Sequence, residues 1–165
     1  MLGHDAAALI ERLRPAGLSA EIVVNAGFDR GQLSSLLTGL DAIDARADAA
    51  EVEGVLLMLV DAPLVAEETV RAVIGRYRAT RASIVRPVRG AEHGHPVLID
   101  RSLFPLLRSA DPTEGAKPIV RAHVSREGDV QVDDEGAFLD IDTEEEYERV
   151  VGRKGKAEEK GEEER

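Results

Sequence analysis

The hydrophobic pattern of the chain is dominated by Val55 to Val60, where six apolar residues follow one another without alternation and lead into Asp61. A continuous apolar run of this length predicts a strand buried on both faces of a parallel sheet. Ligands of open α/β sheets bind beyond the carboxyl ends of the strands, so Asp61 would face that crevice. The alternative is that Asp61 only begins a turn before a helix that starts near Ala66.

The rest of the chain alternates between helical and strand-like patterns. Helices are predicted from Asp5 to the stop at Pro15, over 33–43, 67–79 and 101–109, and after Thr143. Strands are predicted at 21–25, 83–88, 97–100, 130–133 and 138–142. Residues 116–123 fit either a helix with Pro118 in its first turn or a strand. Strands that alternate with helices predict an α/β domain with a mainly parallel sheet.

Composition limits the class of protein and its partners. The 165 residues, of which 43% are hydrophobic, predict one domain over 1–151 and a charged, disordered tail over 152–165. A net charge of -11 and an aromatic content of 3% argue against a nucleic-acid partner and an anionic membrane surface. Cysteine is absent, and we find neither a secretory signal nor a membrane-spanning stretch, so the expected location is the cytoplasm.

Acidic residues at the ends of two predicted strands are the main candidates for chemistry. Asp61 follows the first of these strands, and Asp140 and Asp142 end the strand predicted at 138–142. Carboxylates brought together at one side of a sheet bind a hard cation, and Mg²⁺ usually takes one or two of them plus substrate phosphates. This pattern indicates phosphoryl or nucleotidyl transfer. For Asp142, the alternative is that it or Thr143 caps the next helix.

Two further segments could meet a phosphorylated ligand. The helix that begins at Gly31 carries Ser34 in its first turn, and free N–H groups with a small hydroxyl let a phosphate approach closely, although Ser34 is also an ordinary first-turn residue. The loop 89–96, RGAEHGHP, holds His93 and His95 without the third and fourth ligands of a zinc site. Its glycines suit either a ligand loop or a plain tight turn.

Seven short motifs then occur in a fixed order along the chain. They are LGHDA, a strand ending in Asn25, GQLSSL, LVDAPLV, GHPVLI, EGAKPIV and DIDTEEEY. In this order they resemble the MobA-like NTP transferases, most closely the branch that contains molybdenum-cofactor cytidylyltransferase. The resemblance implies a Rossmann-like nucleotidyltransferase fold. It also implies Mg²⁺-dependent transfer of a nucleoside monophosphate from an NTP, CTP or similar, to a small acceptor such as the molybdenum cofactor, with release of pyrophosphate.

The resemblance also assigns roles to individual residues. Asp61 is expected to be the first metal ligand, and Asp142 or its neighbour Asp140 the second. The expected contacts to the nucleotide are Asn25, Gly31 and Ser34. The expected acceptor-side residues are Gly94, His95, Pro96 and Lys117, the last standing where the family often has arginine.

One departure from the family pattern concerns the N-terminus. The Gly-rich loop of the type L-A-A-G-x-S-x-R-M-G, which wraps the triphosphate in the family, is absent, and the resemblance begins only at Leu2. The domain is therefore expected to be N-terminally truncated, lacking its first strands and its phosphate loop, unless the protein extends upstream of Met1. Whether this chain is an enzyme stays open. The alternative is an inactive family member that serves as a binding module and pairs an open sheet edge with a protein partner or a second copy.

Overall fold

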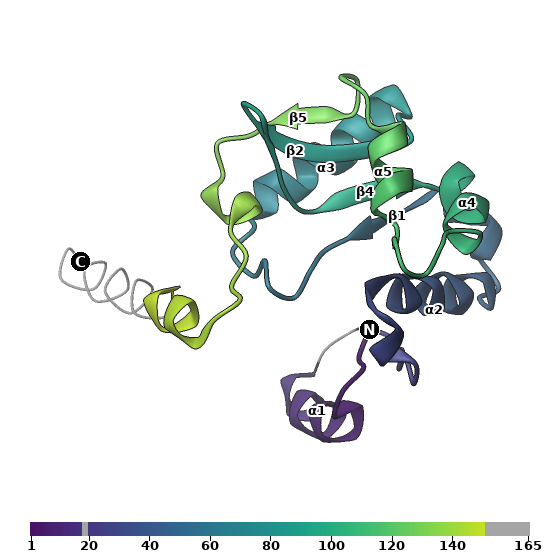
Figure 1. Ribbon diagram of the computed structural model, residues 1–165, viewed down its shortest axis with the longest axis vertical. Helices are drawn as coiled ribbons and strands as arrows, with labels where there is room; N and C mark the ends of the chain where they lie inside the picture. The colour runs from purple at the N-terminus through teal and green to yellow at the C-terminus, as the bar shows by residue number, and fades with distance from the viewer. Residues whose placement is uncertain (18–19, 151–165) are drawn as a thin grey trace.

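A computed structural model describes residues 1–17 and 20–150 (Figure 1). The predicted tail at 152–165 lies outside the described residues. The helices are α1 Ala6–Leu13, α2 Gln32–Asp44, α3 Glu67–Thr80, α4 Phe104–Arg108 and α5 Lys117–His123, and residues 144–150 are also helical. The strands are β1 Gly54–Leu57, β2 Ile84–Arg89, β3 Glu92–His93, β4 Val97–Asp100 and β5 Asp129–Gln131. Within the described residues, no helix combines the length and the apolar character needed to cross a membrane.

The sheet corrects the predicted fold class. Its main path, β1-β4-β2-β3, is antiparallel at every step, and only β5 pairs with β2 in parallel. The prediction of a mainly parallel, Rossmann-like sheet is therefore wrong. The cause is the short connection from Arg89 to Val97, since a parallel neighbour needs a crossover of roughly a dozen residues or more. The chain instead turns back after β2, and β4 enters between β2 and β1 with reversed direction.

Three strands nevertheless share one direction. β1 and β2 are each antiparallel to β4 and therefore run the same way, and β5 is parallel to β2. The carboxyl ends of these three strands consequently lie at the same end of the sheet. We call this end, where the strands stop, the carboxyl edge. The loop 58–66 that follows β1 and the segment that follows β5 both leave from this edge (Figure 1).

The core lies on both faces of the sheet because successive strand residues point to opposite sides. Ile84 and Ile99 pack in one cluster with side chains of α2 and α4. Their neighbours Val85 and Leu98 pack on the other face against Tyr77 and a second side chain of α3. The molecule thus has three layers, with α2, α4 and α5 on one face and α3 on the other.

The strand predicted at Val55 to Val60 is shorter and less buried than its sequence indicates. It ends at Leu57, and all four β1 residues are only partly buried. Beyond it, Met58 is 44% exposed and Val60 is 96% exposed. Both faces of β1 are contacted, since Val55 packs against the cluster with α2 and α4 and Leu56 against the cluster with α3. In the described part of the chain β1 pairs only with β4, however, so it is an edge strand whose burial is incomplete.

Two other predicted strands do not form. Residues 21–25 contribute only an isolated parallel bridge between Leu2 and Val24. The stretch 138–142 follows a 3₁₀ turn, Glu135–Phe138, and has no ladder. By contrast, the strand at Val97–Asp100 is confirmed, and Pro118 in the first turn of α5 resolves the ambiguous 116–123 segment as a helix.

Candidate functional site

Asp61 lies in the loop after β1 with an uncommitted side chain. Its carbonyl accepts a hydrogen bond from the Ile141 N–H at 2.8 Å. Its carboxylate Oδ1 is buried and has no hydrogen-bond partner in the described residues. A buried polar atom without a partner is uncommon in folded proteins and asks for an explanation, such as a bound ion.

The hydrogen bonds at the start of α3 are accepted by the Asp134 side chain and not by the Asp61 side chain. The Asp134 carboxylate accepts hydrogen bonds from the Ala66 N–H at 2.9 Å, the Thr69 hydroxyl at 2.6 Å and the Gly136 N–H at 3.0 Å. Burial by itself raises the pKa of Asp134, but these hydrogen bonds outweigh it and hold that pKa below its usual value. Asp61 itself lies in a turn, in which the Ala62 N–H donates to the Leu59 carbonyl at 3.4 Å, so the turn alternative stays open, but its carboxylate takes no part in the start of α3.

The helix at 144–150 likewise begins without the Asp142 carboxylate. The Thr143 hydroxyl accepts a hydrogen bond from the Glu146 N–H at 3.2 Å, while the Glu146 carboxylate accepts the N–H groups of Thr143 and Asp142 at 3.0 Å each. This is a capping box. The hydrogen bond from the Thr143 hydroxyl and that from the Asp142 N–H lower the pKa of Glu146. Asp142 gives only its backbone N–H to the cap, and the side chains of Asp142 and Asp140 are exposed.

The two acidic segments meet, because Ile141 lies between Asp140 and Asp142 and is hydrogen-bonded to Asp61. No group of three His, Cys, Asp or Glu side chains able to hold a metal ion exists within residues 1–17 and 20–150. Two carboxylates completed by phosphate oxygens and water are nevertheless the usual environment of protein-bound Mg²⁺. The Asp61 Oδ1 atom without a partner therefore fits one ligand of a Mg²⁺ ion that arrives with a phosphorylated substrate.

The predicted nucleotide-side residues form one hydrogen-bonded cluster at the start of α2. Asn25 is 5% exposed, and its amide donates to the hydroxyls of Ser34 at 2.8 Å and Ser35 at 3.0 Å. The Ser34 hydroxyl lies 2.7 Å from the carbonyl oxygen of Gly31, which has a φ of 91° and precedes α2. The structure brings Asn25, Gly31 and Ser34 together, and it already uses the Ser34 hydroxyl in an internal hydrogen bond.

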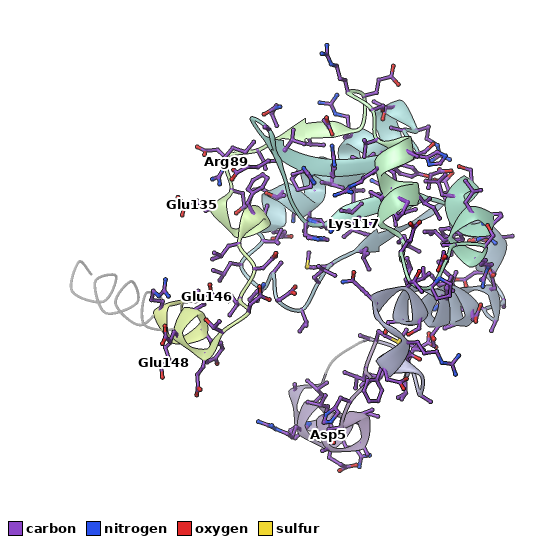
Figure 2. The ribbon with its side chains drawn as sticks, viewed as in Figure 1. Asp5, Arg89, Lys117, Glu135, Glu146 and Glu148 are labelled. Carbon is purple, nitrogen blue, oxygen red and sulfur yellow. The ribbon has the colours of Figure 1, made fainter. Side chains whose placement is uncertain are left out.

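The acceptor-side loop is held against the segment that follows β5. The His95 N–H donates to the Ala137 carbonyl at 2.8 Å. A Cβ at Gly94 would lie 1.9 Å from that same oxygen, so this close approach requires glycine. Pro96 is fully buried, and the Nδ1 atom of His95 is buried without a partner in the described residues. Lys117 is exposed at the first residue of α5 (Figure 2).

Asp134 is the residue at this edge that sequence reasoning missed. An Asp two residues before Gly136 predicts a local turn, and the structure contains that hydrogen bond. Its bonds to Ala66 and Thr69, however, cross 68 and 65 positions of the chain. No local pattern reports contacts over such a separation.

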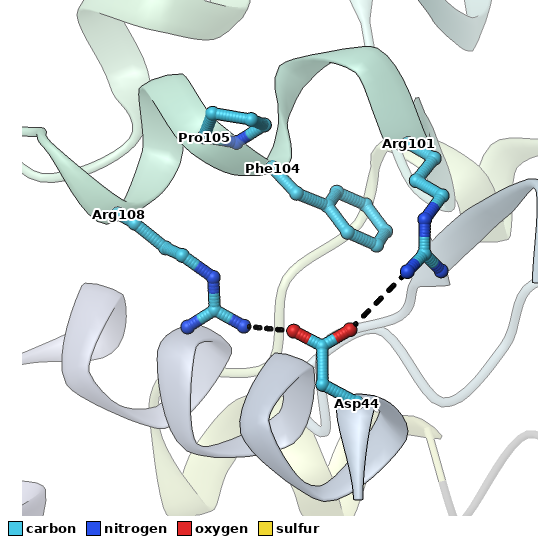
Figure 3. Close-up of a pocket in the computed structure, with 5 residues that line it drawn as sticks. All are labelled: Asp44, Arg101, Phe104, Pro105 and Arg108. Atoms are coloured by element: carbon cyan, nitrogen blue, oxygen red, sulfur yellow. Dashed lines mark hydrogen bonds and ion pairs between the residues drawn. The ribbon is translucent and has the colours of Figure 1, made fainter. Parts of the chain in front are cut away.

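A pocket of about 240 Å³ lies elsewhere, between the end of α2 and α4 (Figure 3). It is lined by Asp44, Arg101, Phe104, Pro105 and Arg108. Asp44 pairs with both arginines, at 3.4 Å to Arg101 and 2.7 Å to Arg108. None of the residues predicted for the site lines this pocket, and its one carboxylate pairs with both of its arginines, so its charged groups serve the contact between α2 and α4.

Comparison with solved structures supports a relationship to mycobacterial proteins. Rv0371c from Mycobacterium tuberculosis H37Rv is 28% identical, with a TM-score of 0.66, over 92% of this chain and 72% of that one. A homologue of Rv0371c from Mycobacterium sp. strain JC1 is 27% identical, with a TM-score of 0.64 and the same two coverages. No curated protein matches the chain.

Comparison with protein families gives a direct assignment. Residues 4–127 match the MobA-like NTP transferase domain. The matched region includes Asn25, Asp61, His95 and Lys117 and ends before Asp142. Because this match covers well over half of the sequence, the chain belongs to the MobA-like NTP transferase family.

Proposed function

We propose that this chain transfers a nucleoside monophosphate from an NTP, CTP or a similar nucleotide, to a small acceptor such as the molybdenum cofactor, and releases pyrophosphate. Family membership supports the use of an NTP. The observation that carries the proposal is the hydrogen bond from Ile141 to Asp61, because it joins the backbone segments that bear two uncommitted acids, Asp61 and Asp142.

Asp61 and Asp142 would hold Mg²⁺, with Asp140 as the alternative to Asp142. The buried Asp61 Oδ1 can coordinate a metal ion without breaking any hydrogen bond within the described protein. Bound Mg²⁺ supplies neutralisation of the negative charge on the phosphate oxygens during transfer.

The remaining residues would orient the two substrates. An acceptor oxygen attacks the α-phosphorus, a new P–O bond forms, and the bond to the α–β bridging oxygen breaks, so that the electron pair leaves with pyrophosphate. Asn25, Gly31 and Ser34 would contact the nucleotide, and the Ser34 hydroxyl would exchange the Gly31 carbonyl for a ligand oxygen. The acceptor would meet the loop at Gly94, His95 and Pro96, and the exposed charge of Lys117 would attract an anionic acceptor.

The test is turnover of α-labelled CTP, GTP and ATP with Mg²⁺ and a pterin acceptor. We expect Asp61→Asn to reduce turnover by more than about 100-fold, since even loss of a residue behind a metal ligand typically costs about 10- to 100-fold. Of Asp140→Asn and Asp142→Asn, the variant with the larger loss identifies the second ligand. The matched control is Asp48→Asn, an exposed acid paired with Arg46. Undiminished turnover in Asp61→Asn would refute the assignment.

A second candidate function is partner binding at the outer edge of β1. The Arg101 N–H donates to the Glu53 carbonyl, so the ladder register turns the N–H and C=O groups of Gly54 and Leu56 away from β4. Along the described chain no strand covers this edge, and the exposed Val60 follows it. Such an edge can take up an extended strand from a partner or from a second copy.

Amide hydrogen exchange at increasing protein concentration tests pairing between copies. If β1 pairs with a second copy, the Leu56 amide becomes protected as concentration rises, while the Leu57 amide, which faces β4, is protected throughout. A monomer in sedimentation, with rapid Leu56 exchange at every concentration, would contradict self-pairing.

A further inference from the structure

We propose that Asp134 is a positioning residue for the acidic site formed by Asp61 and Asp142, with Asp140 as the alternative to Asp142. It has this role because it anchors the segment 134–141 across the loops that carry Asp61 and His95. This inference rests on the proposed function for the role of the site. Its geometric part concerns only residues of this chain.

The anchor consists of three hydrogen bonds to one carboxylate. Asp134 Oδ2 accepts from the Ala66 N–H and from the hydroxyl of Thr69, which is 3% exposed. Asp134 Oδ1 accepts from the Gly136 N–H. The residue before α3 is Ala66, whose side chain cannot cap a helix, so a carboxylate from another segment serves the start of α3.

From this anchor the segment runs along both loops (Figure 1). A Cβ at Gly136 would lie 2.0 Å from the Leu64 carbonyl oxygen, so the two backbones are in direct contact. The Ala137 carbonyl then accepts the His95 N–H, and the Ile141 N–H donates to the Asp61 carbonyl, each at 2.8 Å. The segment 134–141 thus contacts both the loop 58–66, which carries Asp61, and the loop 89–96, which carries His95.

This arrangement matters because no strand ladder fixes the parts that it joins. Residues 139–142 lie outside any strand, and Asp61 lies beyond the end of β1. Both buried side-chain atoms without partners in the described residues, Asp61 Oδ1 and His95 Nδ1, belong to loops held by this segment. A metal or substrate site must be held within about 0.5 Å of its working geometry by such supporting contacts.

The simpler alternative is that Asp134 only caps α3. In that case its removal frays the start of α3 and leaves Ile141 and His95 as they were. The positioning role predicts instead that both distant contacts loosen together, which amide exchange can detect without any substrate.

The experiment compares the wild-type chain with Asp134→Asn, Thr69→Val and Thr69→Ser. Thr69→Ser is the matched control, because it keeps the hydroxyl that donates to Asp134. The exchange rates of the Ile141 and His95 amides report whether the two distant hydrogen bonds stay closed. Titration with Mn²⁺, a spectroscopic substitute for Mg²⁺, reports the metal affinity of the acidic site.

We expect exchange at Ile141 and His95 to accelerate about 10-fold or more in Asp134→Asn, because an anchoring contact that is lost lets the segment open. Mn²⁺ affinity should fall about 10- to 100-fold, the usual cost of losing a residue that supports metal ligands. Thr69→Val should also accelerate the amide exchange and lower the Mn²⁺ affinity, but by less. If Asp134→Asn does not fold, Thr69→Val alone tests whether Asp134 positions the segment. Thr69→Ser should resemble the wild type.

Wild-type protection at Ile141 and His95 in both Asp134→Asn and Thr69→Val would overturn the inference. Failure of the proposed function looks different. A wild-type chain whose Mn²⁺ binding is absent, or unchanged by Asp61→Asn, contradicts the metal site, while accelerated exchange at Ile141 in Asp134→Asn would still support the positioning role.

Discussion

Carboxylates in two regions of this molecule have opposite surroundings. Between α2 and α4, Asp44 binds Arg101 and Arg108, and Arg108 also binds Asp41. At the carboxyl edge of the sheet, Asp61 has a buried oxygen with no partner among the described residues, and Asp142 leaves the capping of the next helix to Thr143 and Glu146. Paired carboxylates contribute to stability, whereas carboxylates without partners are available to a ligand.

Among paired carboxylates the largest expected cost of removal lies at a third place, where the buried Tyr77 binds the partly buried Asp100. The Tyr77 hydroxyl, on a side chain that is 4% exposed, donates to Asp100 at 2.5 Å. Tyr77→Phe should lower the free energy of unfolding by about 2 kcal/mol, within the range for hydrogen bonds to charged groups. Urea denaturation near pH 7 measures this loss. An unchanged midpoint would show that this paired carboxylate does not stabilise the fold.

The same pair gives a pH dependence with a defined sign. Burial, followed by the hydrogen bond to Asp100, raises the pKa of Tyr77 to about 12. Because the unfolded value is about 10, the contribution of this group is complete below pH 10 and is lost as pH rises toward 12. The pKa of Asp100 is lowered in spite of burial by hydrogen bonds from Ser102 and Tyr77, so its contribution is lost as pH falls below about 4. Tyr77→Phe should flatten the alkaline loss and reduce the acid loss.

A smaller effect is expected in the helix contact. Asp44→Asn removes the carboxylate that joins Arg101 to Arg108 and should cost about 1 kcal/mol, the upper range for partly exposed ion pairs. The melting temperature should fall by about 2–4 °C. Because salt screens exposed charges, the difference from wild type should shrink at about 1 M salt. A difference that salt does not alter would argue against an electrostatic origin.

The smallest effect on stability is expected at Asp61. Asp61→Asn exchanges a partly exposed carboxylate, whose buried Oδ1 has no partner in the described chain, for a neutral amide, so the free energy of unfolding should stay within about 0.5 kcal/mol of wild type or rise slightly. Thermal denaturation without metal measures it. A loss comparable to that of Asp44→Asn would mean that the Asp61 carboxylate supports the loop, and the contrast between the two regions would disappear.

The sequence predicted the features that have a local cause. The helical spacing at 33–43 and 67–79 matches α2 and α3, and Pro118 marks the start of α5. The order of strands in the sheet has no local cause. Nothing in residues 97–100 alone states that they enter between β1 and β2. The direction of β4 was readable, because the connection from Arg89 to Val97 is too short for a parallel crossover, and this direction makes the predicted parallel sheet wrong.

The candidate site divides in the same way. The position of Asp61 after an apolar strand is readable from the chain, and Asp61 still meets the 140–142 segment although the strand predicted there does not form. The long-range contacts of Asp134 with Ala66 and Thr69 are not readable, because they depend on how the ends of β1 and β5 are brought together. The metal ligands and substrate contacts themselves stay predictions.

The reversed direction of β4 has a consequence for how such a protein can diversify. Because β4 begins where β1 ends, Leu57 pairs with Val97, and the hairpin before β4 opens at the same edge as the loop after β1. One edge therefore collects loops from two separate connections. Insertions between Gly90 and Glu92 would lengthen a surface hairpin without altering the covalent connection that carries Asp61. The hairpin can therefore vary in length, over evolution or by design, while the loop that carries Asp61 keeps its connection to β1.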